Sequence, residues 1–328
     1  MLAKIVMAAA LLLAAADAPR FSVVDRIAGP DGGYDYISVD SELQRVYVGR
    51  EYGVMAVDLA TNKVIDKFVA ANDVAAVLII PDTKLMLSTE YDAGSVVLFD
   101  RTSGAVKKRI KVGKSPDAAL YDASSKLVFV MNADSNDTTI IDVKRGKVVA
   151  TVPLGGKPEA GVADGKGQVF INIEDTAEIA VLDVKSRTVT TRFKLPGCVE
   201  PTGIAYDPGS ATLISACHNG VARLVNAGNG ASRGAVAIGQ NADGAIFDGP
   251  HRTVWVPCAD GTLSWFRLEM NGKVTAVDSM RTEPGARTAA LDPKTGRLYL
   301  ASGQSTPDDK PVAGSFKILV VAPTPPAT

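Results

Sequence analysis

Seven positions that recur about every 42 residues carry the side chains most able to bind a ligand or do chemistry. They are Asp35, Val77, Asp117, Glu159, Thr202, Asp243 and Arg287, with steps of 42, 40, 42, 43, 41 and 44 residues. Carboxylates that converge on one pocket could hold a hard cation through their oxygen atoms. They could equally bind the amino group of a ligand whose own carboxylate pairs with Arg287. The third interpretation is a wet channel mouth, where the carboxylates pair with the arginine and with solvent.

The same period runs through the rest of the chain and predicts the elements that position these residues. A second row lies five residues further on, at Asp40, Asp82, Asp122, Asp164, Asp207, Asp248 and Asp292. A third row, Asp58, Asp100, Asp142, Asp183 and Asn226, ends short apolar runs and opens turns in which Asp and Asn bond their own backbone. A fixed period of this length with four short strands per unit is the signature of a β-propeller. We therefore predict an all-β fold with seven blades of four antiparallel strands.

The last blade is one strand short. Its strands are predicted at 288–291, 297–301 and 316–321, after which the chain ends. Residues 21–27 have the length and character of a strand but belong to no blade. Pairing this N-terminal segment with the last blade would remove an open sheet edge and close the ring. Function is expected on the face whose loops lead into the inner strands, because loops can vary without harming the blades.

Length and composition agree with one soluble β domain. The chain has 328 residues, of which 46% are hydrophobic and 22% charged, and 30 Gly and 18 Pro supply its turns. We predict a propeller over 17–323 and an unstructured tail at 324–328. A ring that closes on itself needs no partner for its stability, so we expect a monomer.

Residues 1–16 are predicted to be a secretory signal peptide. Lys4 provides a short positive region, residues 5–13 an apolar core, and 14–16 the small alanines needed for cleavage. The apolar stretch is shorter than the roughly 20 residues of a membrane span. No cysteine lies near the cleavage region and no arginine pair precedes the core, which argues against a lipoprotein and a twin-arginine signal. The expected compartment is the bacterial periplasm.

The charge balance argues against nucleic acid as a partner. The chain has 35 Lys and Arg against 36 Asp and Glu, and loss of Lys4 leaves 34 basic residues and a net charge of about −2. Nucleic-acid binders neutralise phosphates with a basic surface. The basic run at 107–111 lies on a predicted outermost strand, where charges protect a sheet edge from aggregation.

The repeats resemble a known family. Leu-Val-Phe-Val at 127–130 with Thr-Ile-Ile-Asp at 139–142, and Arg-Val-Tyr-Val at 45–48 with Val-Met-Ala-Val-Asp at 54–58, are similar to the YVTN-repeat β-propellers and most closely to the YncE-like periplasmic proteins. Pro116, Pro158 and Pro201 precede the inner strands, as that repeat often has. The resemblance covers essentially the whole mature chain and implies a periplasmic propeller without implying a reaction. Blades 5 and 6 depart most, with Asn226 and then 267–268 where the others carry Asp.

The loops between the second and third strands of the blades add polar residues on the same face. They include Arg50, Glu51, Tyr52, Glu90, Tyr91, Asp92, Asn132, Asp134, Asn172, Glu174, Asp175 and His218. These types resemble the metal ligands of sugar-lactonase propellers, which implies a metal-dependent hydrolase or lyase with one divalent ion, held by Asp117, Glu159, Asp243, Asn132 and Asn172. The first prediction is instead a cofactor-free scaffold that binds a small molecule or a periplasmic protein. Its channel-mouth residues would be Asp35, Asp117, Glu159, Asp243 and Arg287.

Three cysteines are expected on this face as well. Cys198 precedes the inner strand of blade 5, while Cys217 and Cys258 end the second strands of adjacent blades. The hairpin of blade 5 brings Cys217 opposite roughly Glu200, so we predict a Cys198–Cys217 disulfide, which suits an oxidising compartment. Cys217–Cys258 is the alternative pairing. A thiolate and imidazole metal site with His218 is disfavoured, because adjacent residues of an extended segment point apart.

No catalytic residue is indicated by motif. The two histidines lie far apart in sequence and no Gly-x-Ser-x-Gly occurs, so a serine hydrolase is unsupported. His251 lies in a turn between the first and second strands of blade 6, on the opposite face, and is expected to be a turn residue.

Overall fold

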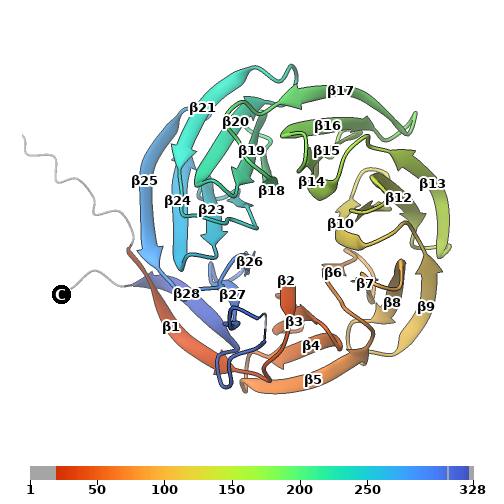
Figure 1. The fold of residues 1–328 in the computed structure, drawn as a ribbon, viewed down its shortest axis with the longest axis vertical. Helices are drawn as coiled ribbons and strands as arrows, with labels where there is room; N and C mark the ends of the chain where they lie inside the picture. Colours follow the sequence, from red (N-terminus) through yellow and green to blue (C-terminus); the bar gives the residue numbers. More distant parts are fainter. Residues whose placement is uncertain (1–19, 309, 325–328) are drawn as a thin grey trace, which may run out of the picture.

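The computed structural model describes residues 20–308 and 310–324, which form a ring of seven blades (Figure 1). These residues contain 28 strands in seven separate sheets, each of four antiparallel strands. The prediction of an all-β, seven-bladed propeller is therefore confirmed. Within the described residues, no helix is long and apolar enough to cross a membrane. The predicted signal peptide at 1–16 lies outside the described residues, as do residues 325–328 of the predicted tail.

Blades follow one another in chain order, and the strands of each blade run outward from the axis. Blade 1 comprises β2 (Tyr34–Asp40), β3 (Arg45–Arg50), β4 (Gly53–Asp58) and β5 (Lys63–Ala70). Blade 2 comprises β6 (Val77–Ile79), β7 (Leu85–Glu90), β8 (Ser95–Asp100) and β9 (Val106–Lys111). Blade 3 comprises β10 (Pro116–Asp122), β11 (Leu127–Asn132), β12 (Asp137–Asp142) and β13 (Lys147–Pro153). Blade 4 comprises β14 (Pro158–Ala163), β15 (Gln168–Ile173), β16 (Glu178–Asp183) and β17 (Thr188–Lys194).

The remaining blades keep this pattern. Blade 5 comprises β18 (Pro201–Asp207), β19 (Thr212–Cys217), β20 (Val221–Asn226) and β21 (Ser232–Ala237). Blade 6 comprises β22 (Ile246–Asp248), β23 (Thr253–Cys258), β24 (Thr262–Leu268) and β25 (Val274–Arg281). Blade 7 comprises β26 (Thr288–Leu291), β27 (Leu298–Ser302) and β28 (Lys317–Thr324), and its outermost strand is β1 (Arg20–Ala28).

The first strand of the chain closes the ring against the last. β1 pairs antiparallel with β28, from Phe21 opposite Pro323 to Ile27 opposite Ile318. Figure 1 shows the start of β1 and the end of β28 side by side at the rim. The predicted N-terminal closing strand is confirmed, and β28 extends to Thr324, the first residue of the predicted tail. Closure leaves no blade with an unpaired face.

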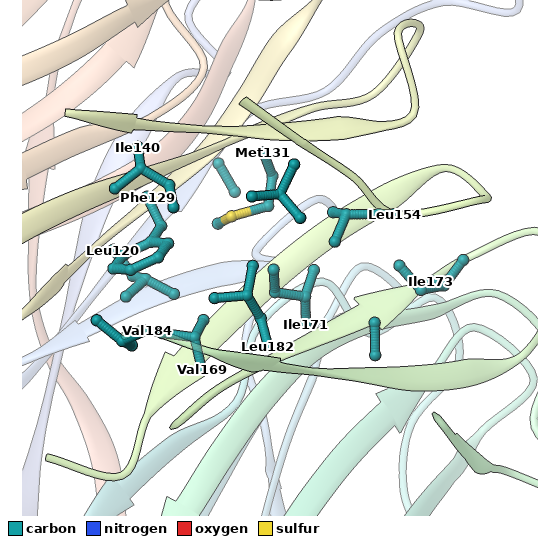
Figure 2. Packing of buried hydrophobic residues seen from close by; sticks show 13 residues of the cluster. Leu120, Phe129, Met131, Ile140, Leu154, Val169, Ile171, Ile173, Leu182 and Val184 are labelled. Atoms are coloured by element: carbon teal, nitrogen blue, oxygen red, sulfur yellow. The ribbon is translucent and has the colours of Figure 1, made fainter. Parts of the chain in front are cut away.

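Apolar side chains of adjacent blades pack against each other between the sheets. Between blades 3 and 4, Phe129 and Met131 of β11 meet Ile171 of β15 and Leu182 of β16, and all four are fully buried (Figure 2). The middle strands are apolar on both faces because both faces are covered. Burying one such side chain contributes about 1.5–3 kcal/mol relative to leaving it exposed.

The repeated aspartates hold turns and join neighbouring blades on the face opposite the channel mouth. Asp40 accepts hydrogen bonds from the backbone N–H groups of Glu42 and Leu43, at 2.9 and 3.0 Å. It also accepts one from Arg101 of blade 2, at 3.1 Å. Arg252 of blade 6 makes the same kind of contact with both carboxylate oxygens of Asp207 in blade 5. These residues are structural, in agreement with their repetition along the chain.

Arg50 lies inside the protein and not on the loop surface where the sequence placed it. It is 0% exposed, and its guanidinium donates to the carbonyl oxygens of Gly33 (2.8 Å) and Pro30 (2.7 Å). It also lies 3.8 Å from the ring centroid of Phe316 in blade 7. The sequence did not predict the burial of Arg50, because its hydrogen-bond acceptors come from the segment after β1, which crosses over blade 1. Arg50 therefore ties the closing segment to the first blade.

Replacing Arg50 should destabilise the ring. Arg50→Ala leaves two carbonyl groups of the crossing segment without their donor, and we expect a loss of about 3 kcal/mol in the free energy of unfolding. Chemical denaturation at neutral pH measures this. The matched control is Arg145→Ala, because Arg145 is 77% exposed and its removal should change stability by less than about 0.5 kcal/mol. Equal effects of the two substitutions would contradict the proposed role of Arg50.

Candidate functional site

The inner strands bring the predicted channel-mouth residues to one cavity. A cavity of about 280 Å³, here called the axial chamber, is lined by Asp35, Asp117, Glu159, Glu174, Thr202, His218, Asn241, Asp243, Ala259 and Arg287. Asp35, Asp117, Glu159 and Arg287 each lie at or next to the start of an inner strand, so a seven-fold ring turns them toward the axis. All five residues predicted from the sequence as channel-mouth residues are therefore neighbours.

The guanidinium of Arg287 interacts with three groups of the protein itself. Its Nε donates to Asp243 at 2.8 Å, and its guanidinium lies 3.8 Å from the carboxylate of Asp35. One N–H also donates to the carbonyl oxygen of Tyr34 at 3.1 Å. The carboxylates of Asp35 and Asp243 outweigh the burial of Arg287 and raise its pKa, so it stays charged. Arg287 thus neutralises part of the chamber, and Asp35 and Asp243 compete with any ligand carboxylate for its guanidinium.

Asp117 and Glu159 form a carboxyl pair that makes no ion pair with a Lys, Arg or His of the described residues. Burial raises the pKa of Asp117 to about 6, the charge of Asp243 adds to the rise, and a hydrogen bond with Glu159 opposes it. Burial, and then the charge of Asp117, raise the pKa of Glu159 well above its usual range. Lys157 is nearby, but its Nζ is 2.5 Å from Glu174. Both shifts favour the protonated form, so this pair binds a proton more readily than ordinary carboxyl groups do.

Tyr36 lies beside the chamber and reaches across the channel. Its hydroxyl, from blade 1, donates to Glu159 of blade 4 at 3.0 Å. Beyond it lies a second cavity of about 220 Å³, whose lining includes Ala118, Ala160 and Gly203, each one residue further along its strand than a chamber residue. The acidic mouth is thereby separated from a lower, less polar part of the channel. Tyr36 was not predicted as a site residue, although it follows Asp35 directly on a predicted inner strand.

The mouth widens over blades 1 to 3. A cavity of about 360 Å³ shares Asp35 and Asp117 with the axial chamber, and its other walls include Glu51, Asp73 and Tyr91. Burial raises the pKa of Asp73, as does the neighbouring charge of Asp92. The whole mouth is therefore acidic, with Arg287 on one side only.

Asn132 and Asn172, two of the metal ligands suggested by the sequence, do not line the cavities of the mouth. Each is 0% exposed. The amide of Asn132 donates to Thr139 (2.9 Å), and that of Asn172 to the carbonyl oxygen of Thr202 (2.9 Å). Asn132 also donates to Asp137 of its own blade at 2.6 Å, whereas Asn172 also donates to the carbonyl oxygen of Gly203 in blade 5 at 3.2 Å. Among residues 20–308 and 310–324, no three His, Cys, Asp or Glu side chains are arranged to hold a metal ion.

A disulfide lies at the rim of the chamber. Cys198 and Cys217 are joined, with Cα atoms 5.5 Å apart, while Cys258 is free and buried. His218, which follows Cys217, lines the chamber, and its Nδ1 lies 2.8 Å from the carboxylate of Glu200. This is the first of the two pairings considered from the sequence, and it fixes the loop that carries His218.

Comparison with known proteins identifies the fold and no family. No protein-family model matches the chain, and no curated protein matches it. A chain of the hydrazine synthase of Kuenenia stuttgartiensis superposes with a TM-score of 0.74 and 13% identity, over 91% of this chain and 97% of that one. A chain from the crystal structure of a mitotic checkpoint complex superposes with a TM-score of 0.75 and 14% identity, over 98% of each. At these identities the likeness shows a shared propeller fold alone.

The raised pKa of Asp117 predicts a pH-dependent gain in stability for Asp117→Asn. The folded protein binds this proton more tightly than the unfolded chain, whose aspartate pKa is about 3.9. The stabilising contribution is therefore complete below about pH 4 and is lost as the pH rises through about 6. Asp117 is partly exposed to solvent in the chamber, so we expect the variant to gain only about 1 kcal/mol over wild type between pH 4 and 7.

Denaturation of both proteins across this pH range measures the difference. Asp308→Asn, in an exposed loop, serves as the control and should show no such trend. A stability difference for Asp117→Asn that stays constant with pH, or falls toward pH 7, would refute the interpretation.

Proposed function

We propose that this chain is an exported periplasmic propeller of the YVTN-repeat, YncE-like type, and that it binds a small cationic ligand in the axial chamber. The observation that carries the proposal is the Asp117 and Glu159 pair. These two carboxyl groups face a cavity and make no ion pair with a described Lys, Arg or His. A ligand ammonium group can take the place of the proton that the pair holds. It supplies both hydrogen-bond donors and the missing positive charge.

The neighbouring groups define what such a ligand must look like. Arg287 is already bound to Asp243 and Asp35, so an amino acid held through its carboxylate is disfavoured against a simple amine. Tyr36 limits the depth of the site at Glu159. The acidic side that contains Asp73 and Glu51 can hold a second positive group. A short diamine therefore fits the arrangement better than a bulky or zwitterionic molecule.

Titration calorimetry with putrescine tests the ligand class. We expect saturable binding of putrescine and none of 1,4-butanediol, which has the same length without charge. The affinity should rise from pH 5 to pH 8 with release of protons, because the amine displaces the proton of the carboxyl pair. Glu159→Gln should weaken binding about tenfold or more, and Asp308→Asn should leave it unchanged. Equal binding by Glu159→Gln and wild type would exclude the chamber as the amine site.

The same titration separates the alternatives. Binding of Ca²⁺ or Mg²⁺ that is lost in Glu159→Gln would favour the metal-dependent hydrolase or lyase. If neither amines nor divalent ions bind, the chamber is a wet channel mouth, and a protein-interaction scaffold is the function to pursue.

Export is supported by the apolar segment behind Lys4 and by a disulfide that persists in oxidising compartments. Expression of the full chain in a bacterial host should place it in the periplasmic fraction, shortened by residues 1–16. Its intact mass should be two hydrogens lighter than that of the reduced chain. A chain with residues 1–16 deleted should stay in the cytoplasm with all three cysteines reduced. Recovery of an uncleaved, reduced chain from the cytoplasm would overturn the localisation.

A further inference from the structure

A second cavity lies at the closing seam of the ring, far from the axial chamber. It has a volume of about 250 Å³ and lies between blades 6 and 7, and its walls include Phe21, Trp255, Trp265, Arg267 and Pro323. Phe21 and Pro323 come from the paired ends of β1 and β28, on the face opposite the axial chamber. Below it is called the seam cavity.

The seam cavity exists because the last blade is built from both ends of the chain. In blade 1, the hydroxyl of Tyr47 donates to the carbonyl oxygen of Arg101, which lies in the turn between the two outer strands of blade 2. Trp255 occupies the corresponding position of blade 6, opposite Trp265 as Tyr47 is opposite Ala56. Its neighbour, blade 7, has no such turn, because its two outer strands are β28 and β1. The acceptor that a turn would supply is therefore missing.

The indole N–H of Trp255 is left without a partner. Trp255 is only 3% exposed, it lines the cavity, and its Nε1 makes no hydrogen bond with any described residue. A buried donor without a partner carries a free-energy cost, and a ligand with an acceptor atom would remove that cost.

Blade 6 departs from the repeat at the two positions that face this space. Trp265 stands where the five preceding blades have Ala56, Leu98, Ile140, Val181 and Leu224. Arg267 stands where they have Asp58, Asp100, Asp142, Asp183 and Asn226. The chain has two tryptophans in all, and both line the same cavity. Turn formation, which explains the aspartates, does not explain an arginine here.

The rings and charges of the lining define a ligand. Phe21 meets Trp255 and Trp265 edge to face, with centroids 4.6 and 5.5 Å apart, so the rings form a fixed aromatic wall. Two carboxylates also line the cavity, and each has a partner. Asp248 bonds His251 at 2.8 Å, and Asp278 accepts the backbone N–H of Ser279. Arg267 is exposed and forms no ion pair among the described residues. It is the cation of the lining that remains available.

We propose that the seam cavity is a binding site for a small, flat aromatic molecule with an anionic group, such as an aromatic carboxylate. The ring packs on Trp265 and Phe21, an acceptor atom takes the N–H of Trp255, and the anionic group pairs with Arg267. Cavities of roughly 150 Å³ hold a benzene ring, so this one has room for a bicyclic ring.

Binding of 2-naphthoate and its neutral counterpart 2-naphthol to the mature protein tests the proposal. Titration calorimetry gives the affinities, and tryptophan fluorescence reports the location, because both tryptophans line the site. Saturable naphthoate binding with a change in tryptophan emission is expected. Arg267→Gln should weaken naphthoate about tenfold and leave naphthol within about twofold. Arg145→Gln, which removes another exposed arginine from a turn between outer strands, should change neither affinity.

A second variant separates the aromatic wall from the charge. Trp265→Leu places in blade 6 the residue that blades 2 and 5 already carry, so the blade should fold, and both ligands should lose about tenfold or more in affinity. The proposal is overturned if naphthoate does not saturate, if its binding leaves the tryptophan emission unchanged, or if Trp265→Leu binds as wild type does.

Discussion

Every blade of this protein has two apolar faces, and the requirement that both be covered governs the rest of the structure. Phe129 and Ile171, on sheets of different blades, are both fully buried in the cluster between them, so neither blade could remain stable at an open end. A closed ring is the arrangement that gives each of seven similar sheets two neighbours. Closure in turn requires β1, the first strand of the chain, to complete the last blade. The segment that follows β1 then crosses blade 1 and is held by the buried Arg50.

Closure also explains why acidic groups meet on the axis. The inner strands of a ring begin around one opening, so Asp35, Asp117 and Glu159 come together although they are far apart in sequence. Their mutual repulsion opposes folding; Arg287 relieves it around Asp35 and Asp243, and the charge of Lys157 lowers the pKa of Asp117. The opposite side of the opening stays acidic. Carboxyl groups with raised pKa values that gather in one cavity mark it as a candidate functional site.

Much of this could be predicted from the sequence, because a period of about 42 residues fixes strand order, blade number and which residues start the inner strands. The features that were not predicted concern where single side chains point and what they bond. Asn132 and Asn172 were expected in loops, but they lie within β11 and β15, and their buried side chains bond to Thr139 and to the carbonyl oxygen of Thr202. Arg50 looked like a loop residue because its acceptors lie in a segment that has no repeat. Tyr36 reaches across the channel to blade 4, a contact that no pattern within one blade contains.

The residues with chemical interest are those at which the repeat fails. An aspartate that recurs in blade after blade, such as Asp40, forms a turn and joins two sheets, and its recurrence shows that every blade needs it. Arg287 and Glu159 occur once at their position in the period, and so do Trp265 and Arg267 at theirs. A buried tryptophan pair is not needed to build a blade, since the six other blades are built without one. In a fold made of copies, the differences between the copies are therefore the best guide to where ligands bind.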